Sequence, residues 1–364
     1  MGERKETRTS AVIFPLGPYH PVLSEPSALR LRLRGERVIA ASEPITGYGR
    51  RGLLALVAGQ PIEDALVVLE RACAHAGQAY RLALSIAVER AARITAPRPA
   101  QLARVFFAEL EMTQSALWAL AEIARALKLP ALRASGLEQR ERIYEAAAEA
   151  TGERVYWGVA RPGGVRGDIR FAEASAPLSW LPAAIESWRG ASAPHGPLGQ
   201  AAERIDRVQP KRLQSRGADV AASEDARRAA PYDGYRAITL DWTSLDDRPD
   251  AATEVAAHAL RLVARLKLSY DIMRVCAEAL GDADLAQAKT PLAPGQGSAR
   301  IQTAHGPARL DVTVANDQTV RDIHLVTSCA ATLADAPGWL VGRALAHVPA
   351  VLAGLDLCPS CADL

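Results

Sequence analysis

The chain has 364 residues, and its 43 lysine and arginine residues nearly balance 41 aspartate and glutamate residues, giving a formal net charge of +2. This balance offers no electrostatic basis for binding nucleic acid, so nucleic-acid partners are not expected. Hydrophobic residues make up 49% and charged residues 23% of the chain, which is typical of a globular protein and excludes a disordered one. The most apolar stretches contain charges such as Glu122 and Arg343, so no membrane-spanning segment is predicted. The charged beginning shows no signal-peptide pattern, and we expect a cytoplasmic location.

The N-terminal part, residues 11–60, is predicted to be a β region. Leu29, Leu31 and Leu33 alternate with arginines, which is the period of a half-buried strand. Gly35 and Glu36 then indicate a turn, and the following residues 38–40 a return strand. Together these signals predict a hairpin.

A helical core is predicted over residues 61–150. Apolar residues three or four apart predict one helix over residues 62–94, weakened at Gly77, where another backbone could come close. A second helix follows Pro99 and ends at Pro130, and a shorter one covers residues 138–150. Farther along, residues 251–280 predict a third long helix with Gly281 as its C-cap.

The remaining segments are a loop-rich part over residues 172–215 and a C-terminal part over residues 251–364. The first is rich in proline, glycine, alanine and serine, and we interpret it as loop with short helical pieces. In the second, residues 310–314 and 320–326 flank the turn Asn316-Asp317 and predict another hairpin. A last helix is predicted over residues 338–352. The expected fold is one mainly helical α+β domain over residues 1–364, with a central long-helix bundle and small hairpin sheets from both ends.

The cysteines are the first candidates for chemistry. Their number, five, argues against a disulfide framework. Cys358 and Cys361 form a CxxC motif, which could bind one soft metal ion, serve as a redox pair or simply be packed thiols. Cys73 could be a ligand or a small buried hydrophobic residue. His75 lies two residues later and, on a helix, would face elsewhere.

Two loops are further candidates. Glu25 lies between Pro21 and Pro26, where it could be a positioned proton carrier or a solvated side chain. The stretch from Arg161 to Asp168 reads RPGGVRGD, and its proline and glycines predict a tight, rigid loop. We expect ion pairs between its arginines and its aspartate to give it a structural role.

Taken in order, these stretches resemble the large subunit of group 4 [NiFe] hydrogenases and its relative, the 49 kDa subunit of respiratory complex I. The motifs that carry the resemblance are GPYHPVLSEPSALRLRLRGERVIAASEPITGYGRRG, ERACAHAGQAYRLALSIAVE, RPGGVRGDI, DAR followed by PYDGY, and the C-terminal DLCPSC. They span residues 14–364. The resemblance identifies the chain as a divergent member with an incomplete set of metal ligands.

The resemblance assigns roles to single residues. In hydrogenase members four cysteines bind a nickel–iron centre, and Cys73, Cys358 and Cys361 occupy three of those positions, whereas Ala76 occupies the fourth. Glu25 falls at the position of a proton-transfer glutamate and is the catalytic candidate. The residues expected to line the cavity are His20, Ala76, His305 and Arg309, the last lying one place after Ala308, which replaces the family's active-site arginine.

The resemblance also implies cofactors and partners. A nickel–iron or iron centre with an incomplete ligand set is expected in this chain, and a [4Fe–4S] cluster in a partner that is similar to the iron–sulfur small subunit of complex I. Membrane-arm subunits would hold the chain at the inner face of the membrane. Complex I members instead use the vacated cavity to reduce quinone, but here Ser24 stands where they carry a histidine.

Two functions remain open from the sequence. The first is an oxidoreductase subunit, hydrogenase-like or NADH–quinone oxidoreductase-like, with a modified cavity. The second is a non-catalytic interaction subunit or a scaffold for metal-cofactor assembly. A plain zinc-binding CxxC protein is a third, more distant reading.

Overall fold

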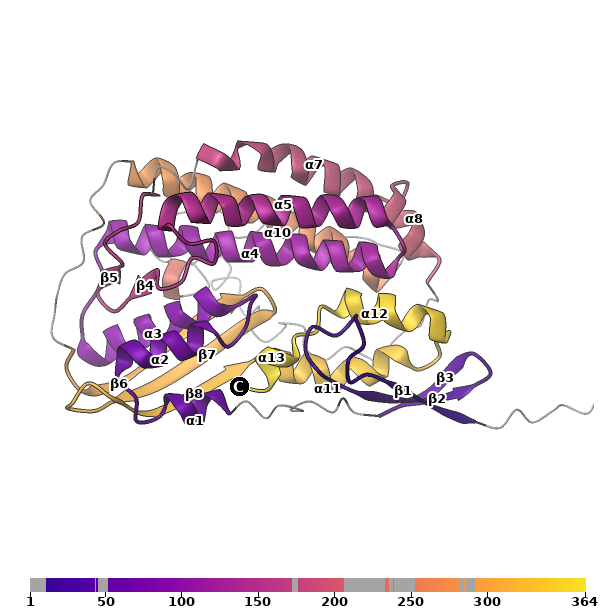
Figure 1. The fold of residues 1–364 in the computed structure, drawn as a ribbon, viewed down its shortest axis with the longest axis horizontal. Helices are drawn as coiled ribbons and strands as arrows, with labels where there is room; N and C mark the ends of the chain where they lie inside the picture. Colours follow the sequence, from indigo (N-terminus) through magenta and orange to yellow (C-terminus); the bar gives the residue numbers. More distant parts are fainter. Residues whose placement is uncertain are drawn as a thin grey trace, which may run out of the picture.

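A computed structural model describes residues 11–42, 44, 52–171, 176–205, 233–235, 238, 253–281, 285 and 292–364. Long helices form one layer above smaller antiparallel sheets and short helices, as Figure 1 shows. The predicted mainly helical α+β class is confirmed. The predicted segment DAR, with Asp225 and Arg227, lies outside the described residues.

The α-helices are α1 (Leu53–Val57), α2 (Ile62–Glu70), α3 (Gly77–Ala92), α4 (Arg98–Ala126), α5 (Pro130–Thr151), α7 (Leu181–Ser192), α8 (Pro197–Glu203), α10 (Glu254–Leu280), α11 (Cys329–Leu340), α12 (Val348–Leu355) and α13 (Pro359–Ala362). Short 3₁₀ helices cover Ala176–Trp180, Asp233–Tyr235 and Leu345–His347. The strands are β1 (Val12–Leu16), β2 (Leu29–Arg34), β3 (Arg37–Ala41), β4 (Ala160–Arg161), β5 (Gly164–Val165), β6 (Gly295–Thr303), β7 (Gly306–Val314) and β8 (Val320–Thr327).

The helical layer is built around α4 and α10, which pack along each other, with α5 against α4 and α7 against α10. Pro99 lies in the first turn of α4, where its fixed φ angle favours helix and its missing N–H is not needed. In α10, the Thr253 side chain accepts a hydrogen bond from the Ala256 N–H and caps the helix, which ends at Gly281 as predicted. These contacts bury the apolar stripes of both long helices.

The helix predicted over residues 62–94 is wrong in one respect, because the structure has two helices, α2 and α3, separated by residues 71–76. A Cβ atom at Gly77 would lie 2.2 Å from the Glu70 carbonyl oxygen. Only glycine allows this approach, so the chain folds back on itself here and α3 begins anew at Gly77. The close approach at Gly77 was predictable, but the break that it accompanies was not.

Three other helix boundaries also differ from the prediction. Pro130 opens α5 instead of only ending α4, so this helix begins well before residue 138. The helix predicted over residues 338–352 is wrong, because α11 ends at Leu340 and α12 begins at Val348. Gly342 between them has a φ of 89°, a left-handed conformation that ends a helix. Within the loop-rich segment, α7 and α8 form the expected helical pieces.

Both predicted hairpins are confirmed, and each gains a strand. Strand β1 joins the first to give the order β1-β2-β3, and β6 joins the second to give β6-β7-β8. A third, two-stranded sheet is formed by β4 and β5 within the RPGGVRGD loop. Helix α3 packs closely on β6, because a Cβ atom at Gly297 would lie 1.9 Å from the Ala87 carbonyl oxygen.

The described residues form two hydrophobic cores. One lies among the long helices and the N-terminal sheet, and the other lies where α2, α3 and the β6–β8 sheet meet the C-terminal segment. The second core contains four buried cysteines, Cys73, Cys329, Cys358 and Cys361. It is therefore the place where the sequence candidates converge.

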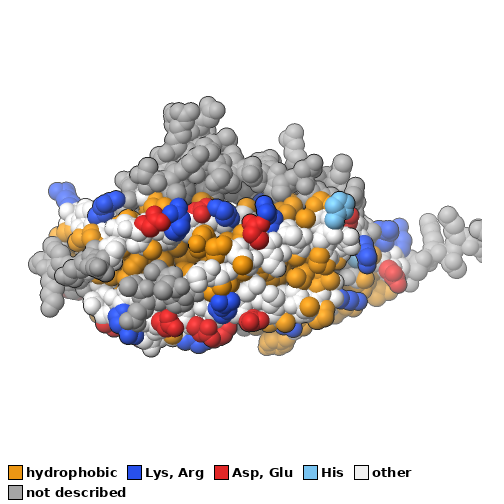
Figure 2. Space-filling model, turned by 90° about the horizontal axis from the view of Figure 1, so that it is seen from above, with side chains coloured by type: hydrophobic (Ala, Val, Ile, Leu, Met, Phe, Trp, Pro, Cys, Tyr) orange, Lys and Arg blue, Asp and Glu red, His pale blue; other side chains and the backbone are white. Residues whose placement is uncertain are grey.

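Charges of both signs are mixed on one face of the molecule. Figure 2 shows, on the described part of the face seen from above, positive and negative side chains interspersed with hydrophobic ones. Among the described helices, none is both long and apolar enough to cross a membrane.

Candidate functional site

Three segments that are far apart in the sequence bring the candidate metal ligands together. Cys73 lies in the break between α2 and α3, and Cys358 and Cys361 flank and enter α13 near the C-terminus (Figure 1). The Sγ atoms of Cys73 and Cys358 are 3.5 Å apart. His305, from the turn between β6 and β7, completes a set of four in which all ligand atoms lie within 4.8 Å of one another. We call Cys73, His305, Cys358 and Cys361 the cysteine–histidine cluster.

His305 reaches this cluster from a very short turn. Gly306, with a φ of 114°, adopts the left-handed conformation that closes the turn between β6 and β7. The Ser328 hydroxyl donates a hydrogen bond to the His305 carbonyl oxygen at 2.9 Å and holds the turn against the start of α11. The imidazole is 6% exposed, and neither ring nitrogen has a hydrogen-bond partner among the described residues. The sequence predicted His305 only as a lining residue, whereas the structure places it among the thiols.

A carboxylate and a second histidine lie behind His305. Asp356 Oδ2 is 3.6 Å from His305 Nδ1 and 3.8 Å from His258 Nε2. Asp356 follows α12 in a left-handed conformation, with a φ of 48°, which turns the chain from α12 toward α13. Because Nδ1 of His305 faces this carboxylate, Nε2 is the nitrogen left for the thiols.

The cluster favours a thiolate beside a charged imidazole. Burial alone would lower the pKa of His305, but the negative charges of Cys358 and Asp356 outweigh it and raise this pKa well above its usual value. Hydrogen bonds from the Cys361 and Cys73 thiols hold the pKa of Cys358 well below its usual value, despite burial. Burial would raise the pKa of the half-buried Asp356, but the facing histidines His305 and His258 outweigh it and lower this pKa. Cys358 is therefore the thiol most readily ionised, and the thiolate is the form that ligates metals.

Glu25 is hydrogen-bonded to the segment that carries the C-terminal cysteines. The Ser360 hydroxyl donates a hydrogen bond to Glu25 Oε1 at 2.8 Å, although the two residues are 335 positions apart. Ser360 is the residue immediately before Cys361 and is buried. The loop between β1 and β2 therefore brings the candidate proton carrier to the cluster.

The other predicted lining residues differ in their positions. Ala76 is fully buried and caps the start of α3, so it offers a methyl group where the resemblance implies a thiol. His20 lies on the same loop as Glu25, and its Nδ1 accepts a hydrogen bond from the Val22 N–H at 3.2 Å. Arg309 as a lining residue is a wrong prediction. Alternate residues of β7 face opposite sides, so Arg309 is exposed and pairs with Asp311 at 2.9 Å.

His75 and Cys329 are features that sequence reasoning misplaced or missed. His75 was expected to face elsewhere, but its ring stacks on Trp118 and meets the His305 ring edge-on, each at 5.9 Å between centroids. Helical spacing does not apply, because residues 71–76 are not helical. Burial, and then the nearby charge of His305, lowers the pKa of His75 to about 4. Cys329 opens α11, and its hydrogen bond with Cys361 raises the pKa of the latter. No sequence pattern pointed to Cys329.

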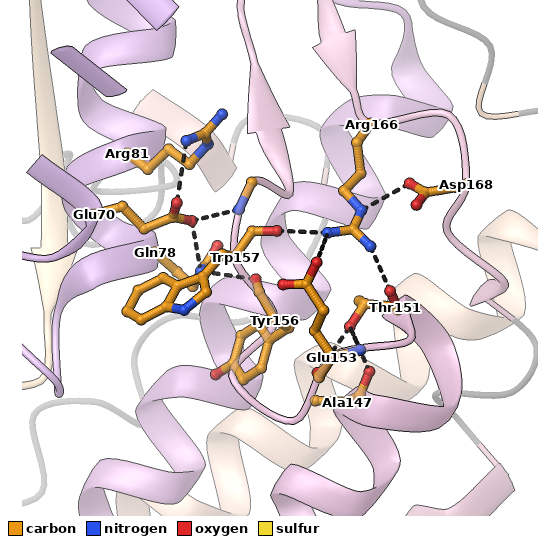
Figure 3. Close-up of polar contacts among 11 residues, drawn as sticks. Glu70, Gln78, Arg81, Ala147, Thr151, Glu153, Tyr156, Trp157, Arg166 and Asp168 are labelled. Carbon is orange, nitrogen blue, oxygen red and sulfur yellow. Dashed lines mark hydrogen bonds and ion pairs between the residues drawn. The ribbon is translucent and has the colours of Figure 1, made fainter. Parts of the chain in front are cut away.

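A buried network holds the break that carries Cys73. Glu70, at the end of α2, accepts hydrogen bonds from Gln78 Nε2 at 2.9 Å and from the Gly158 N–H at 2.8 Å. Its other oxygen lies 3.1 Å from Arg81 Nη1, as Figure 3 shows. From α4, Glu111 accepts hydrogen bonds from the N–H groups of Gln78 and Ala79 at 2.8 and 3.0 Å. Both sides of the break are thereby fixed to the same frame.

The RPGGVRGD loop is part of this frame. Arg166 Nε donates to Asp168 at 2.7 Å and Nη1 to the Trp157 carbonyl oxygen at 2.7 Å, while Nη2 bonds the Thr151 carbonyl oxygen (Figure 3). Arg104 of α4 donates to the Gly164 carbonyl oxygen at 2.9 Å. The loop is locked by arginines, as expected, and these contacts attach it to α4 and α5.

The structure thus combines a long-helix layer with a sheet and a C-terminal segment that enclose four buried cysteines. No protein-family model matches the chain. The chain is 30% identical over 153 residues to an NADH-quinone oxidoreductase subunit of Thermosipho melanesiensis, covering 42% of the chain and 41% of that protein. It is 30% identical over 178 residues to an F(420)H(2) dehydrogenase subunit of Methanosarcina mazei, covering 47% and 46%. It is 30% identical over 158 residues to the alpha subunit of a membrane-bound hydrogenase of Pyrococcus furiosus, covering 43% and 37%.

The expected relationship is therefore confirmed: the chain is a homologue of these oxidoreductase, dehydrogenase and hydrogenase subunits. Its matched part spans less than half the length of each of these three relatives. A solved structure of the membrane-bound sulfane sulfur reductase, an archaeal respiratory membrane complex, contains a chain of the same fold. The two chains superpose with a TM-score of 0.78 at 21% identity, over 99% of this chain and 100% of the other.

The donor set differs from the one that the resemblance implies. A nickel–iron centre of this family needs four thiolates, two of them bridging, whereas the fully buried Ala76 supplies none. The fourth donor present is the imidazole of His305. The residues therefore do not fit the binuclear centre, and no chemistry of that centre is assigned to this chain.

Proposed function

We propose that the chain is the large-subunit-like component of a membrane-associated, hydrogenase-like or complex I-like oxidoreductase. Its modified cavity would lie beside the cysteine–histidine cluster, and a substrate bound there would exchange electrons with a partner iron–sulfur subunit. The observation that carries the proposal is the hydrogen bond between Ser360 and Glu25. It places a carboxylate within one residue of Cys361, which a purely structural subunit does not need.

The chain's own residues can perform the proton part of a redox reaction. Glu25 is reached through the Ser360 hydroxyl and can deliver a proton to, or remove one from, a group bound next to the thiols. Cys358 is held toward its thiolate form by its neighbours. The cluster is buried in the second core, so charges there interact more strongly than in water.

The relatives support a proposal about the partners. The proteins similar to this chain are subunits of NADH–quinone oxidoreductase, F(420)H(2) dehydrogenase and a membrane-bound hydrogenase. We propose two kinds of partner, an iron–sulfur small subunit that is similar to its counterpart in complex I and carries a [4Fe–4S] cluster, and membrane-arm subunits. The chain would attach peripherally, at the cytoplasmic face of the membrane, through these partners.

A second candidate function is a non-catalytic scaffold derived from the same family. It is favoured by the missing thiol at Ala76 and by the outward position of Arg309, so that among the described residues neither Arg309 nor Ala308 supplies the family's cation. A scaffold would be needed for assembly of the complex but would support no turnover at its own cavity.

The Glu25→Gln variant separates these functions in the assembled complex. Glutamine keeps an oxygen that accepts from Ser360, so assembly should be unchanged, while turnover should fall by about 100-fold or more. Turnover would be measured as dye-linked electron transfer, with reduced methyl viologen as donor and protons or quinone as acceptor. Glu36→Gln, in the exposed turn between β2 and β3, is the matched control. Wild-type turnover in both Glu25→Gln and Cys358→Ser would contradict the redox proposal and favour the scaffold.

A further inference from the structure

We propose that the cysteine–histidine cluster binds one soft divalent metal ion, zinc being the ion that its donors suit, in a closed tetrahedral site with His305 as the fourth ligand. This inference deepens the proposed function and rests on it for the role of the cavity. It replaces the binuclear centre implied by the resemblance with a site for a single ion.

The size of the cluster fits a single tetrahedral ion. Zinc–thiolate bonds of about 2.3 Å and zinc–imidazole bonds of about 2.0–2.1 Å put neighbouring donor atoms about 3.5–3.8 Å apart. The Sγ atoms of Cys73 and Cys358 are already 3.5 Å apart, and all four donors lie within 4.8 Å of one another. Small side-chain rotations are enough to close the set around one ion. Three thiolates and one imidazole are a familiar zinc-binding combination.

The environment of His305 is a second, independent observation. Its side chain is 6% exposed, yet neither ring nitrogen has a hydrogen-bond partner among the described residues. Buried polar groups are normally hydrogen-bonded, so an imidazole that makes no hydrogen bond among the described residues, lies among three buried thiols and has a carboxylate 3.6 Å behind it is suited to bind a metal ion. A metal ion at Nε2 supplies one.

The residues behind His305 are those expected of a metal ligand. Asp356 Oδ2 lies 3.6 Å from Nδ1, in the carboxylate–histidine–metal arrangement that fixes the orientation of the ring. Asp356 is itself faced by His258 at 3.8 Å, and the left-handed turn at Asp356 leads straight to Cys358. The same short segment thus supplies the ligand Cys358 and the carboxylate of Asp356, which orients the ligand His305.

Four protein donors leave no open coordination position, and this has a structural consequence. The ion would join the α2–α3 break, the β6–β7 turn and α13, which are otherwise distant in sequence. It would therefore hold Ser360, and with it Glu25, in the position that the proposed function uses. Cys329 is also buried nearby but is not one of the four, which argues against a second ion.

The test uses the full chain in its complex, isolated without oxygen, freed of metal by a chelator and titrated with Co²⁺. One Co²⁺ per chain is expected, with thiolate-to-cobalt charge-transfer absorption and the intense visible bands of tetrahedral coordination. X-ray absorption of the zinc form should show about three sulfur neighbours near 2.3 Å and one nitrogen near 2.0–2.1 Å. His305→Ala should weaken Co²⁺ binding by at least 10-fold, and Asp356→Asn by about 10–100-fold.

Matched controls are His324→Ala, an exposed histidine on β8, and Cys276→Ser, a buried free thiol on α10 outside the cluster. Both should bind Co²⁺ as the wild type does. The inference would be overturned by any of four results. These are no bound ion, two ions per chain, four sulfur neighbours without a nitrogen neighbour, and undiminished Co²⁺ binding in both His305→Ala and Asp356→Asn. A bound ion with no turnover would refute only the proposed function. Turnover that depends on Glu25 without any bound ion would refute only the metal site.

Discussion

Replacing Glu70 with alanine is expected to destabilise the frame around Cys73. The carboxylate of Glu70 accepts hydrogen bonds from Gln78 and Gly158 and pairs with Arg81, whose side chain is 3% exposed. The variant leaves the Arg81 charge buried, with the Ala160 carbonyl oxygen at 2.6 Å as its remaining hydrogen-bond acceptor among the described residues. Loss of the nearest opposite charge is the most costly consequence of such a change, because only the weaker interaction with Glu63 remains to offset the Arg81 charge.

The expected loss of folding free energy follows from the breaking of a buried ion pair. Removing one partner of a buried ion pair costs about 3–5 kcal/mol, whereas replacing both by apolar residues of similar size is often nearly neutral. Glu70→Ala should therefore lower the free energy of unfolding by about 3–5 kcal/mol. The double variant Glu70→Leu with Arg81→Met should recover most of that loss. Because the break loosens, binding of Co²⁺ at Cys73 should weaken in the single variant as well.

Urea denaturation of the full chain, followed by circular dichroism, measures these differences. Glu138→Ala, an exposed glutamate on α5, is the matched control and should change stability by less than about 0.5 kcal/mol. A loss for Glu70→Ala no larger than that of the control would refute the reasoning. A double variant as unstable as the single one would show that the buried charge is not the cause.

Three further substitutions test other contacts that stabilise the fold. Burial raises the pKa of Glu111 to about 7. The folded state therefore binds the carboxyl proton of Glu111 more tightly than the unfolded state does. The resulting stabilisation is complete below about pH 4.5 and is lost as the pH rises through 7. Between pH 5 and 8 the wild type should lose about 2–3 kcal/mol relative to Glu111→Gln; parallel profiles in urea denaturation would contradict this. Gly297→Ala should lower the melting temperature, because its Cβ would lie 1.9 Å from a carbonyl oxygen of α3, whereas Gly338→Ala in α11, with no described atom within 4 Å, should not. Thr253→Ala should cost about 1 kcal/mol through loss of the α10 cap, and an unchanged denaturation midpoint would argue against it.

Sequence patterns predicted the helices and strands well where the pattern lies within a single element. They did not predict where one helix stops and the next begins. The alternation of leucine and arginine in β2 is visible because each strand has one buried face. The glycine at position 77 permits both a bent helix and a close backbone contact, and only the packing of Glu70 against it decides between them. The same limit applies at Gly342, since apolar residues continue on both sides of the break.

The candidate site was predictable in part. The resemblance pointed to Cys73, Cys358 and Cys361, which the structure places in one cluster. The outward direction of Arg309 could have been found, because Leu310, Val312 and Val314 alternate on the buried face of the same strand. The positions of His305 and Asp356 depend on contacts between β6–β7 and the C-terminal segment. Local sequence holds no signal for contacts of this range.

The most direct test of this account is the metal content of the chain in its complex, purified without oxygen and determined by elemental analysis beside Cys358→Ser. We expect one zinc ion per chain in the wild type and none in the variant, with both chains folded and assembled. Equal zinc content in the two, or no zinc in the wild type, would contradict the proposed metal site.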